Sequence, residues 1–346
     1  YEDVTNVDAV GIITGRSNID AQKQVHVGTG VSVKAGGINV TAGITTVQAL
    51  QATTGTFSAD STINGVSVGK GANSVAANTV LGVTALDANT TGDRNTAIGK
   101  DALTANTTGS KNVAVGENAL MSNTTADDNT ALGVGALDAN TTGSNNTALG
   151  RNSLTDNTTA SYNTAVGASA LLANTTGANN TAVGNEALDA NTTASSNTAI
   201  GAAALGANTT GTLNTAVGHL ALTANTTANR CTALGRSALS TNTIGDDNVA
   251  VGYYALVNST TSSDHTAVGN YALATNTTGE SNTAIGLYAM YDNTTGSYNT
   301  ALGINALGDN TTAGGNTALG YNALRLNTTG ANNVAVGHQA ADANTT

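Results

Sequence analysis

The chain has 346 residues, and its composition is far from that of an ordinary globular protein, with 41 Gly, one Phe, one Cys and neither Pro nor Trp. The formal net charge of −11 is spread thinly, which argues against direct binding to nucleic acid or to an anionic membrane surface. No stretch approaches the roughly eighteen apolar residues of a membrane span, so membrane insertion is not expected.

Residues 1–77 contain short alternating runs such as Val31-Ser32-Val33, with frequent glycine and no fixed period. Alternation of this kind predicts short strands joined by tight turns. We expect this segment to form an irregular β shaft or a cap, and residues 66–75 already look like a degenerate copy of the repeat that follows.

A seventeen-residue unit recurs sixteen times over residues 78–346. A short fixed period means that one unit cannot bury its apolar side chains alone and must stack on its neighbours, which predicts a solenoid. The glycine at position five of the unit allows a positive φ at a sharp corner. The corner glycines are Gly82, Gly99, Gly116, Gly133, Gly150, Gly167, Gly184, Gly201, Gly218, Gly235, Gly252, Gly269, Gly286, Gly303, Gly320 and Gly337.

The other columns of the unit predict strands and turns. In the copy that spans residues 95–111, Thr96 and Ile98 flank Ala97, and this alternation predicts a short strand with the Thr and Ile side chains on one face. A second apolar column at position nine, represented by Leu103, predicts a second extended segment. Gly, Thr and Asn in every unit disfavour helix. The expected fold is therefore an all-β parallel β-solenoid, or β-roll, of seventeen-residue coils.

The narrow core of such a coil favours a partner along its flank. Alanine is nearly constant at positions three and eight, as in Ala97 and Ala102, and small side chains on one face allow a second chain to approach closely. Side-by-side homotrimers are the usual solution for slender β-rods, so we expect a homotrimeric rod. The alternative is that these alanines fill the inside of a tight coil.

An Asn-Thr-Thr stretch closes each unit and has two interpretations. It supplies a turn through side-chain hydrogen bonds to the backbone, or its Asn-x-Thr sequons carry N-glycans along one edge of the rod. The candidate glycosylation sites are Asn89, Asn106, Asn123, Asn140, Asn157, Asn174, Asn191, Asn208, Asn225, Asn258, Asn276, Asn293, Asn310, Asn327 and Asn344. A third interpretation, in which the stacked Thr pairs bind ice, is weakened because they lie in a turn.

Residues capable of catalysis or metal binding are few and scattered. The four His residues do not cluster in the repeat, and the acidic pairs Asp127-Asp128 and Asp246-Asp247 fall in a variable loop column. Cys231 stands alone in the Asn column of position one, so no intrachain disulfide can form; it is either a tolerated small residue or a contact between symmetry mates. We expect no enzyme activity and no cofactor.

Tyrosines gather in the variable positions between residues 253 and 298. Tyr253, Tyr254 and Tyr288 are candidates for a surface patch that binds a glycan or a protein partner, although ordinary surface decoration would give the same pattern.

These motifs resemble those of several fibre proteins. The box Asn95-Thr96-Ala97-Ile98-Gly99 resembles the shorter head repeat of trimeric autotransporter adhesins, which implies a parallel β-roll trimer. The longer unit of residues 78–346 resembles repeats in phage tail-fibre-like proteins, and residues 1–17 resemble a module in structural proteins of marine cyanophages. These resemblances imply a virion or extracellular fibre that reaches a host-surface glycan or protein, with a bacterial adhesin or self-assembling, glycosylated extracellular fibril as the alternative.

Overall fold

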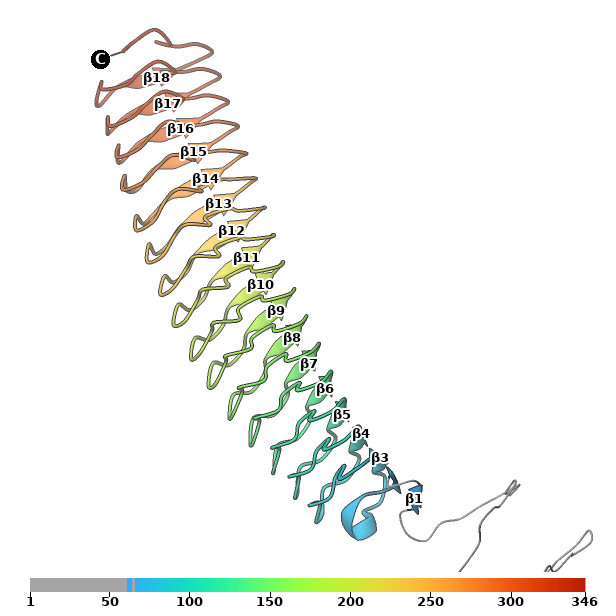
Figure 1. Ribbon diagram of the computed structural model, residues 1–346. Coiled ribbons are helices and arrows are strands. Elements are labelled where there is room, and N and C mark those ends of the chain that lie inside the picture. Colours follow the sequence, from blue (N-terminus) through green and yellow to red (C-terminus); the bar gives the residue numbers. More distant parts are fainter. Residues whose placement is uncertain (1–60, 64–65, 346) are drawn as a thin grey trace, which may run out of the picture. The chain divides into compact units, whose positions relative to one another are not determined.

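The computed structural model describes residues 61–63 and 66–345, and the predictions for residues 1–60 lie outside this part of the chain. The described residues form an all-β parallel solenoid in which successive coils stack along one axis (Figure 1). Each strand pairs in parallel with the strand one repeat later, so that Thr96 lies beside Val113 and Ala97 beside Ala114. The seventeen-residue period of the sequence is therefore the register of the sheet.

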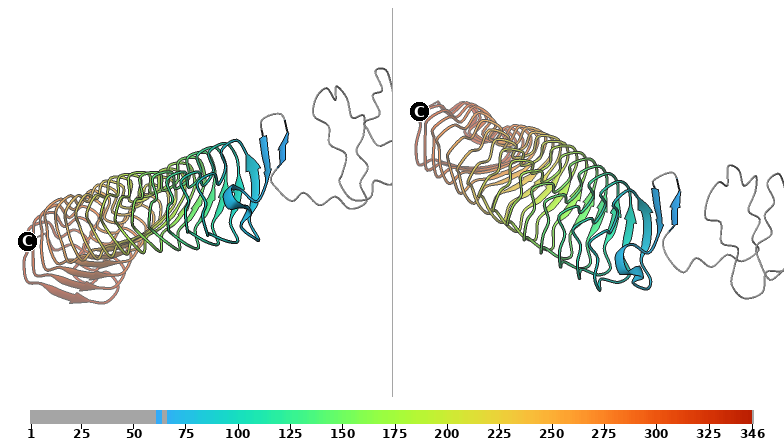
Figure 2. Two further views of the ribbon diagram at one scale, coloured as in Figure 1. Left: turned by 90° about the horizontal axis from the view of Figure 1, so that it is seen from below. Right: turned by 60° about the horizontal axis from the view of Figure 1, so that its bottom comes forward.

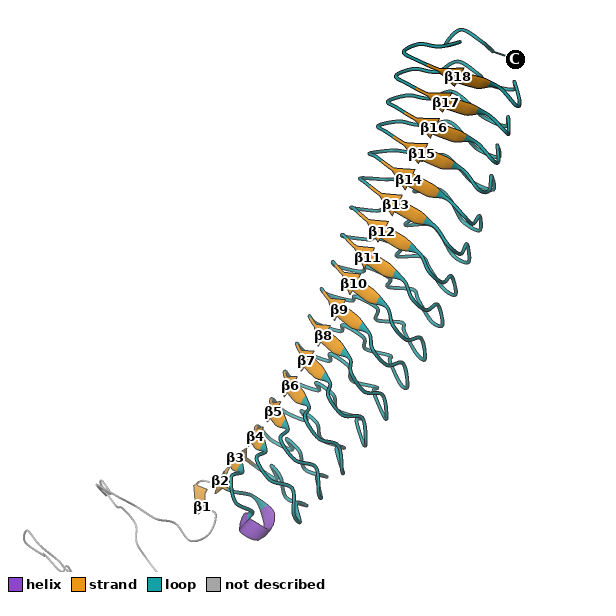
Figure 3. Cartoon of the chain, turned by 180° about the vertical axis from the view of Figure 1, so that it is seen from behind, coloured by secondary structure: helices purple, strands orange, loops and turns teal. Residues whose placement is uncertain are grey.

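Each repeat contributes one strand, which covers positions two to four. The strands of the solenoid are β3 (Thr79–Gly82), β4 (Thr96–Ile98), β5 (Val113–Val115), β6 (Thr130–Leu132), β7 (Thr147–Leu149), β8 (Thr164–Val166), β9 (Thr181–Val183), β10 (Thr198–Ile200), β11 (Thr215–Val217), β12 (Thr232–Leu234), β13 (Val249–Val251), β14 (Thr266–Val268), β15 (Thr283–Ile285), β16 (Thr300–Leu302), β17 (Thr317–Leu319) and β18 (Val334–Val336). The rest of each coil consists of turns and loops, which extend from both ends of each strand in Figure 3.

A cap precedes the first coil. Strand β2 (Val66–Gly69) pairs antiparallel with β1 (Ser61–Ile63) and also antiparallel with β3 (Figure 2). A short 3-10 helix, Ala72–Ser74, follows, and the backbone N–H of Ala72 donates to the carbonyl oxygen of Leu86 at 3.1 Å. Residues 66–74 thus occupy the place of a coil with the strand reversed, and they take up backbone groups that the first coil would otherwise leave unpaired.

The interior of the coil differs from the sequence prediction. The alanines at positions three and eight and the leucine at position nine are fully buried within a single chain, as in Ala97, Ala102 and Leu103. The inward-facing alanines therefore line the inside of a tight coil, and the prediction that they form a face for a second chain was wrong. The alanine columns therefore give no support to the predicted trimer, and they do not determine the number of subunits.

The predicted second extended segment is also absent from residues 78–345. The leucine of position nine lies in a turn with a positive φ, for example 53° at Leu103, and not in a strand. Its backbone nevertheless bonds along the axis, because the N–H of Leu103 donates to the carbonyl oxygen of Ala119 in the next coil at 3.0 Å. Periodic stacking satisfies the backbone of these turns without strand geometry.

The corner glycines have two independent reasons to be glycine. They adopt positive φ, for example 136° at Gly167, which is a conformation that side chains disfavour. A Cβ atom on Gly167 would also lie 2.4 Å from the carbonyl oxygen of Gly184. Consecutive coils therefore touch backbone to backbone at this corner.

Candidate functional site

The outer face of the sheet carries a continuous aliphatic column. Position four is Leu, Ile or Val in every repeat, and none of these sixteen side chains is buried. Leu132, Leu234 and Leu319, for example, are 44%, 46% and 41% exposed. Because each strand alternates its faces, the buried alanine at position three forces the residues at positions two and four outward. We call the side chains of position four the aliphatic column.

A cluster of five tyrosines forms a second distinctive surface. Tyr254, Tyr271 and Tyr288 occupy position seven of three successive coils, and their rings stack with centroid separations of 5.6 and 5.4 Å and interplanar angles of 9° and 18°. Tyr253 and Tyr291 make edge contacts with this row, with centroid separations from 4.4 to 6.2 Å. We call these five residues the tyrosine ladder.

Arg236 lies at one end of the tyrosine ladder. Its Nη1 atom donates hydrogen bonds to the hydroxyl oxygens of Tyr253 at 3.1 Å and Tyr254 at 3.2 Å. The guanidinium carbon also lies 5.6 and 5.4 Å from the centroids of the same two rings, which is within cation–π range. These bonds to neutral hydroxyls hold the guanidinium in place without neutralising its charge.

The structure brings together the three tyrosines that the sequence predicts for the patch, and it adds Tyr271, Tyr291 and Arg236. Of these added residues, Tyr271 carried a signal in the sequence. It lies one full repeat from both Tyr254 and Tyr288, so the three tyrosines must lie in adjacent coils. Alignment by repeat position, rather than by exposure, would have found the row.

Thirteen of the fifteen sequon asparagines lie inside the solenoid, with side chains that are fully buried, as at Asn106, Asn123 and Asn157. The two exceptions are Asn258, which is exposed, and Asn344 in the last coil, which is half-buried. The Nδ2 atom of Asn123 donates to the Oδ1 atom of Asn106 at 2.8 Å and to the carbonyl oxygen of Ala126 at 3.1 Å. An attached sugar would need this nitrogen at the surface, so the burial favours turn formation over N-glycosylation.

This row of amides, which we call the asparagine ladder, is interrupted in one region: Ser259 replaces Asn at position twelve, and Asn242 in the preceding coil donates to Gly245 but not to Asn225. The Oδ1 atoms of Asn225 and Asn242 are both buried without a hydrogen-bond partner. His265 fills part of the vacated space: its Nε2 atom lies 3.1 Å from the Oγ atom of Ser262, and its Nδ1 atom accepts from the backbone N–H of Asn282 at 3.2 Å. Burial lowers the pKa of this imidazole to about 4.

Cys231 is a tolerated residue of the interior. It is fully buried, and its Sγ atom donates to the carbonyl oxygen of Gly245 at 3.2 Å, where other coils use an Asn amide. Burial raises the pKa of this thiol to about 11. The alternative contact between symmetry mates is excluded for the folded coil because the sulfur has no exposed surface.

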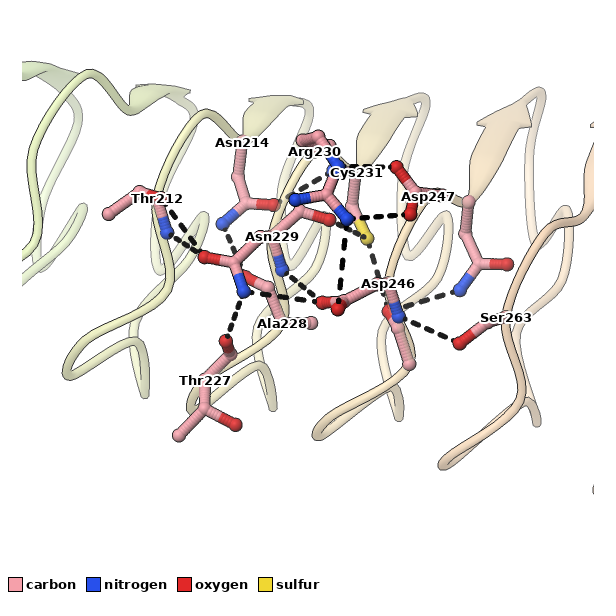
Figure 4. A network of polar contacts seen from close by, with 12 residues as sticks. Thr212, Asn214, Thr227, Ala228, Asn229, Arg230, Cys231, Asp246, Asp247 and Ser263 are labelled. Atoms are coloured by element: carbon pink, nitrogen blue, oxygen red, sulfur yellow. Dashed lines mark hydrogen bonds and ion pairs between the residues drawn. The ribbon is translucent and has the colours of Figure 1, made fainter.

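The acidic pairs take part in contacts between neighbouring loops. Arg230 donates to Asp247 from Nε at 2.6 Å and from Nη2 at 2.7 Å, and Asp246 lies beside it (Figure 4). This ion pair holds the pKa of the Asp247 carboxyl below its usual range. Asp127 accepts from the backbone N–H of Ser110 at 2.6 Å. Within the described residues no group of three His, Cys, Asp or Glu side chains could hold a metal ion.

Comparisons of the chain with protein-family models, curated proteins and solved structures gave no match. Among the residues that the structure describes, no helix is long and apolar enough to cross a membrane. The aliphatic column and the tyrosine ladder therefore carry the functional argument.

Proposed function

We propose that the protein is a homotrimeric fibre, exposed on a virion or outside a cell, whose role is reach and attachment without catalysis. One observation carries this proposal: an uninterrupted aliphatic column faces outward along the whole described solenoid. Water-exposed apolar side chains in a continuous row are typical of a surface that another protein covers.

The area of the aliphatic column suits a stable interface. Nine of the sixteen side chains are 36% to 65% exposed and the other seven are half-buried, which amounts to on the order of 1,000 Å² per chain; a standard interface takes about 800 Å² from each partner. A single narrow ridge along the centre of each sheet lets three copies meet around one axis. Each chain then contributes one ridge to this axis.

The subunit number and the role of the column can be tested together by native mass spectrometry and sedimentation of the full chain. We expect a trimer for the natural sequence and monomers for Leu149→Asp combined with Leu234→Asp, because each carboxylate would face the same apolar axis. Ile244→Asp is the matched control, since Ile244 is 54% exposed but lies in a turn outside the column. A monomeric natural protein, or a double variant that remains trimeric, would refute the proposed interface.

A bacterial adhesin or a self-assembling extracellular fibril is the alternative use of the same rod. End-to-end polymers in purified material would favour it over a virion fibre, because a virion fibre needs one defined length. The burial of thirteen sequon asparagines removes support from a row of glycans along the rod, and it leaves only the exposed Asn258 and the half-buried Asn344 as acceptors for the glycosylated form of this alternative.

Ice binding is a less favoured candidate, and we propose it for the outer face of the sheet instead of the Thr pairs of the turns. Thr at position two and an aliphatic residue at position four form two parallel outward columns on the sheet, as in Thr147 and Leu149. A regular array of hydroxyl and methyl groups on a sheet is a surface that can order water. Thermal hysteresis in a concentrated monomeric sample would support this use, and its absence would remove it; a trimer that buries the columns excludes it.

A further inference from the structure

We propose that the tyrosine ladder, with Arg236 at its end, binds an extended acidic polysaccharide that lies along the solenoid axis. This inference rests on the attachment role proposed above and names the ligand class for it. The supporting observations are the choice of tyrosine at one repeat position, the direction of the row and the unpaired charge of Arg236.

The first observation is the choice of residue at the three stacked tyrosines. Tyr254, Tyr271 and Tyr288 have φ values of 55°, 56° and 54°, in the left-handed region that bulky residues avoid. Position seven has a positive φ in every repeat, so this conformation belongs to the coil, and in eight of the sixteen repeats the position holds Asn, Asp, Gly or Ser, which either tolerate that region or are small. The ladder is particular because three successive coils place a bulky aromatic residue there instead.

The second observation is geometric. The stacked rings occupy one repeat position in successive coils, so the row runs parallel to the stacking axis and advances by one strand spacing per ring, about 4.8 Å. One pyranose residue of an extended glycan advances by a similar length. A linear polysaccharide can therefore place successive sugars over successive coils, with its hydroxyls against the phenol hydroxyls and the ring edges that the stacked row presents.

The third observation is the charge of the surface. Arg236 is exposed, and among the described residues no carboxylate accepts a hydrogen bond from it. Arg230 in the preceding loop, by contrast, is paired with Asp247 through two hydrogen bonds. Residues 236–240, 253–257, 270–274 and 287–291 contain no Asp or Glu; Asp246, Asp247, Asp264 and Glu280 lie in the segments between them, and Asp292 directly follows Tyr291 at the far end of the ladder.

These charges select an acidic ligand. In a chain of net charge −11, the end of the ladder at Arg236 carries one Arg and no carboxylate in its own segment, so this end attracts an anion, while Asp292 lies at the opposite end. The Nε and Nη2 atoms of Arg236 take no part in its bonds to the phenols, so the guanidinium can donate to a carboxylate of the ligand. A uronic acid polymer combines the sugar backbone with this carboxylate.

The test uses a short oligogalacturonate and its fully methyl-esterified form, which share one backbone and differ in charge. We expect calorimetry to show saturable binding of the acid to the full chain, and binding of the ester about tenfold weaker. Arg236→Gln should weaken binding of the acid about tenfold and leave binding of the ester unchanged, because the lost hydrogen bond requires the carboxylate.

Matched variants separate the site from the fold. Arg151 occupies the same repeat position as Arg236, is likewise exposed and has no tyrosine beside it, so Arg151→Gln should leave binding unchanged. Replacing Tyr254, Tyr271 and Tyr288 by Asn, the residue of Asn305 and Asn322 at this position, should remove binding while the native mass stays that of the natural protein. The exposed Tyr162 and Tyr298 lie outside the ladder, and their replacement by Asn should have no effect.

Two results would overturn the inference: no saturable binding of the acid, or equal losses in the Arg151 and Arg236 variants. Equal affinity for the acid and the ester would overturn the role of Arg236 and the acidic ligand class. Because subunit number is measured in every variant, loss of binding in an intact trimer is distinguishable from failure of the proposed fibre assembly.

Discussion

Two residues of each coil, the glycine of position five and the leucine of position nine, adopt backbone conformations that most residues avoid. The corner glycine allows a positive φ where the chain leaves the strand, and the leucine of position nine adopts a left-handed conformation while its side chain fills the centre of the coil. Burial of a leucine contributes about 2 kcal/mol, which offsets the cost of its backbone conformation. The repeat is thus stabilised residue by residue through stacking and not through local propensity.

The corner glycines provide a direct test of this close stacking. We expect Gly167→Ala to destabilise the protein by more than about 3 kcal/mol, because it combines a disfavoured φ with a Cβ atom 2.4 Å from a backbone oxygen. Gly206→Ala is the control, since Gly206 lacks a positive φ and its nearest neighbouring atom would be 3.4 Å from the added carbon. Equal effects of the two substitutions in denaturant unfolding would contradict backbone contact at the corner.

His265 should make stability depend on pH. Its folded pKa, about 4, lies below the ordinary value of 6.5, so the unfolded state binds the proton more readily. The contribution of His265 to the free energy of unfolding is therefore constant above about pH 6.5 and falls as the pH decreases towards 4. The full loss is about 3 kcal/mol. Protonation of Nδ1 would also place two donors face to face, because this atom accepts from the N–H of Asn282.

Comparison with a variant isolates this effect from the titration of the carboxylates. His265→Asn combined with Ser259→Asn restores the residues found at these two positions in most repeats, and it supplies a donor for the unpaired Oδ1 of Asn242. We expect the difference in unfolding free energy between the variant and the natural protein to grow as the pH falls from 6.5 to 4. A difference that is constant across this range would show that His265 is not buried as a neutral ring.

At the scale of the coil, the asparagine ladder closes the loop that returns the chain to its next strand. Each regular amide joins its own turn to the preceding coil, as Asn157 does through Asn140 at 2.9 Å and through Ala160 at 3.0 Å. A buried amide network of this kind is stabilising only while every member has its partners.

Removal of one amide should therefore be costly. We expect Asn157→Ala to lower the unfolding free energy by about 2–4 kcal/mol, because it removes two hydrogen bonds and leaves the Nδ2 atom of Asn174 with one partner fewer. Thr159→Ala, at an exposed position of the same turn, should change it by less than about 0.5 kcal/mol. An equally small effect at Asn157 would mean that the ladder is dispensable.

The sequence predicts the solenoid and its register because both depend on periodicity, and the strand at positions two to four follows from alternation around alanine. It does not predict which face of that strand is inside. A coil of seventeen residues with one leucine at its centre leaves room only for methyl groups, so Ala97 turns inward and Ile98 outward, against the usual preference for burying the larger side chain. The sequence places Tyr254, Tyr271 and Tyr288 one repeat apart, but the bonds from Arg236 to Tyr253 and Tyr254 depend on turn geometry that periodicity does not specify.

At the scale of the whole solenoid, the two surfaces have different requirements. The aliphatic column is uniform along its length, which suits contact with identical copies at every coil, whereas the tyrosine ladder covers a few coils and suits one ligand. Length and specificity are therefore separable in this architecture: repeats can be added or lost without altering the ladder.

Deletion of one whole coil tests this separation. Removing residues 163–179 takes out one full period and joins identical repeat positions, so the remaining coils keep their register and the aliphatic column stays continuous. We expect the circular dichroism spectrum and subunit number to be unchanged, with a denaturant m-value lower by roughly one part in sixteen, because stability in a solenoid is a sum over neighbouring coils. Removing residues 163–170 instead joins unlike positions, brings polar turn residues to the place of buried alanine and leucine, and should abolish the cooperative transition. If both deletions were equally damaging, the solenoid would be a single fixed unit, and its length could not vary independently of the ladder.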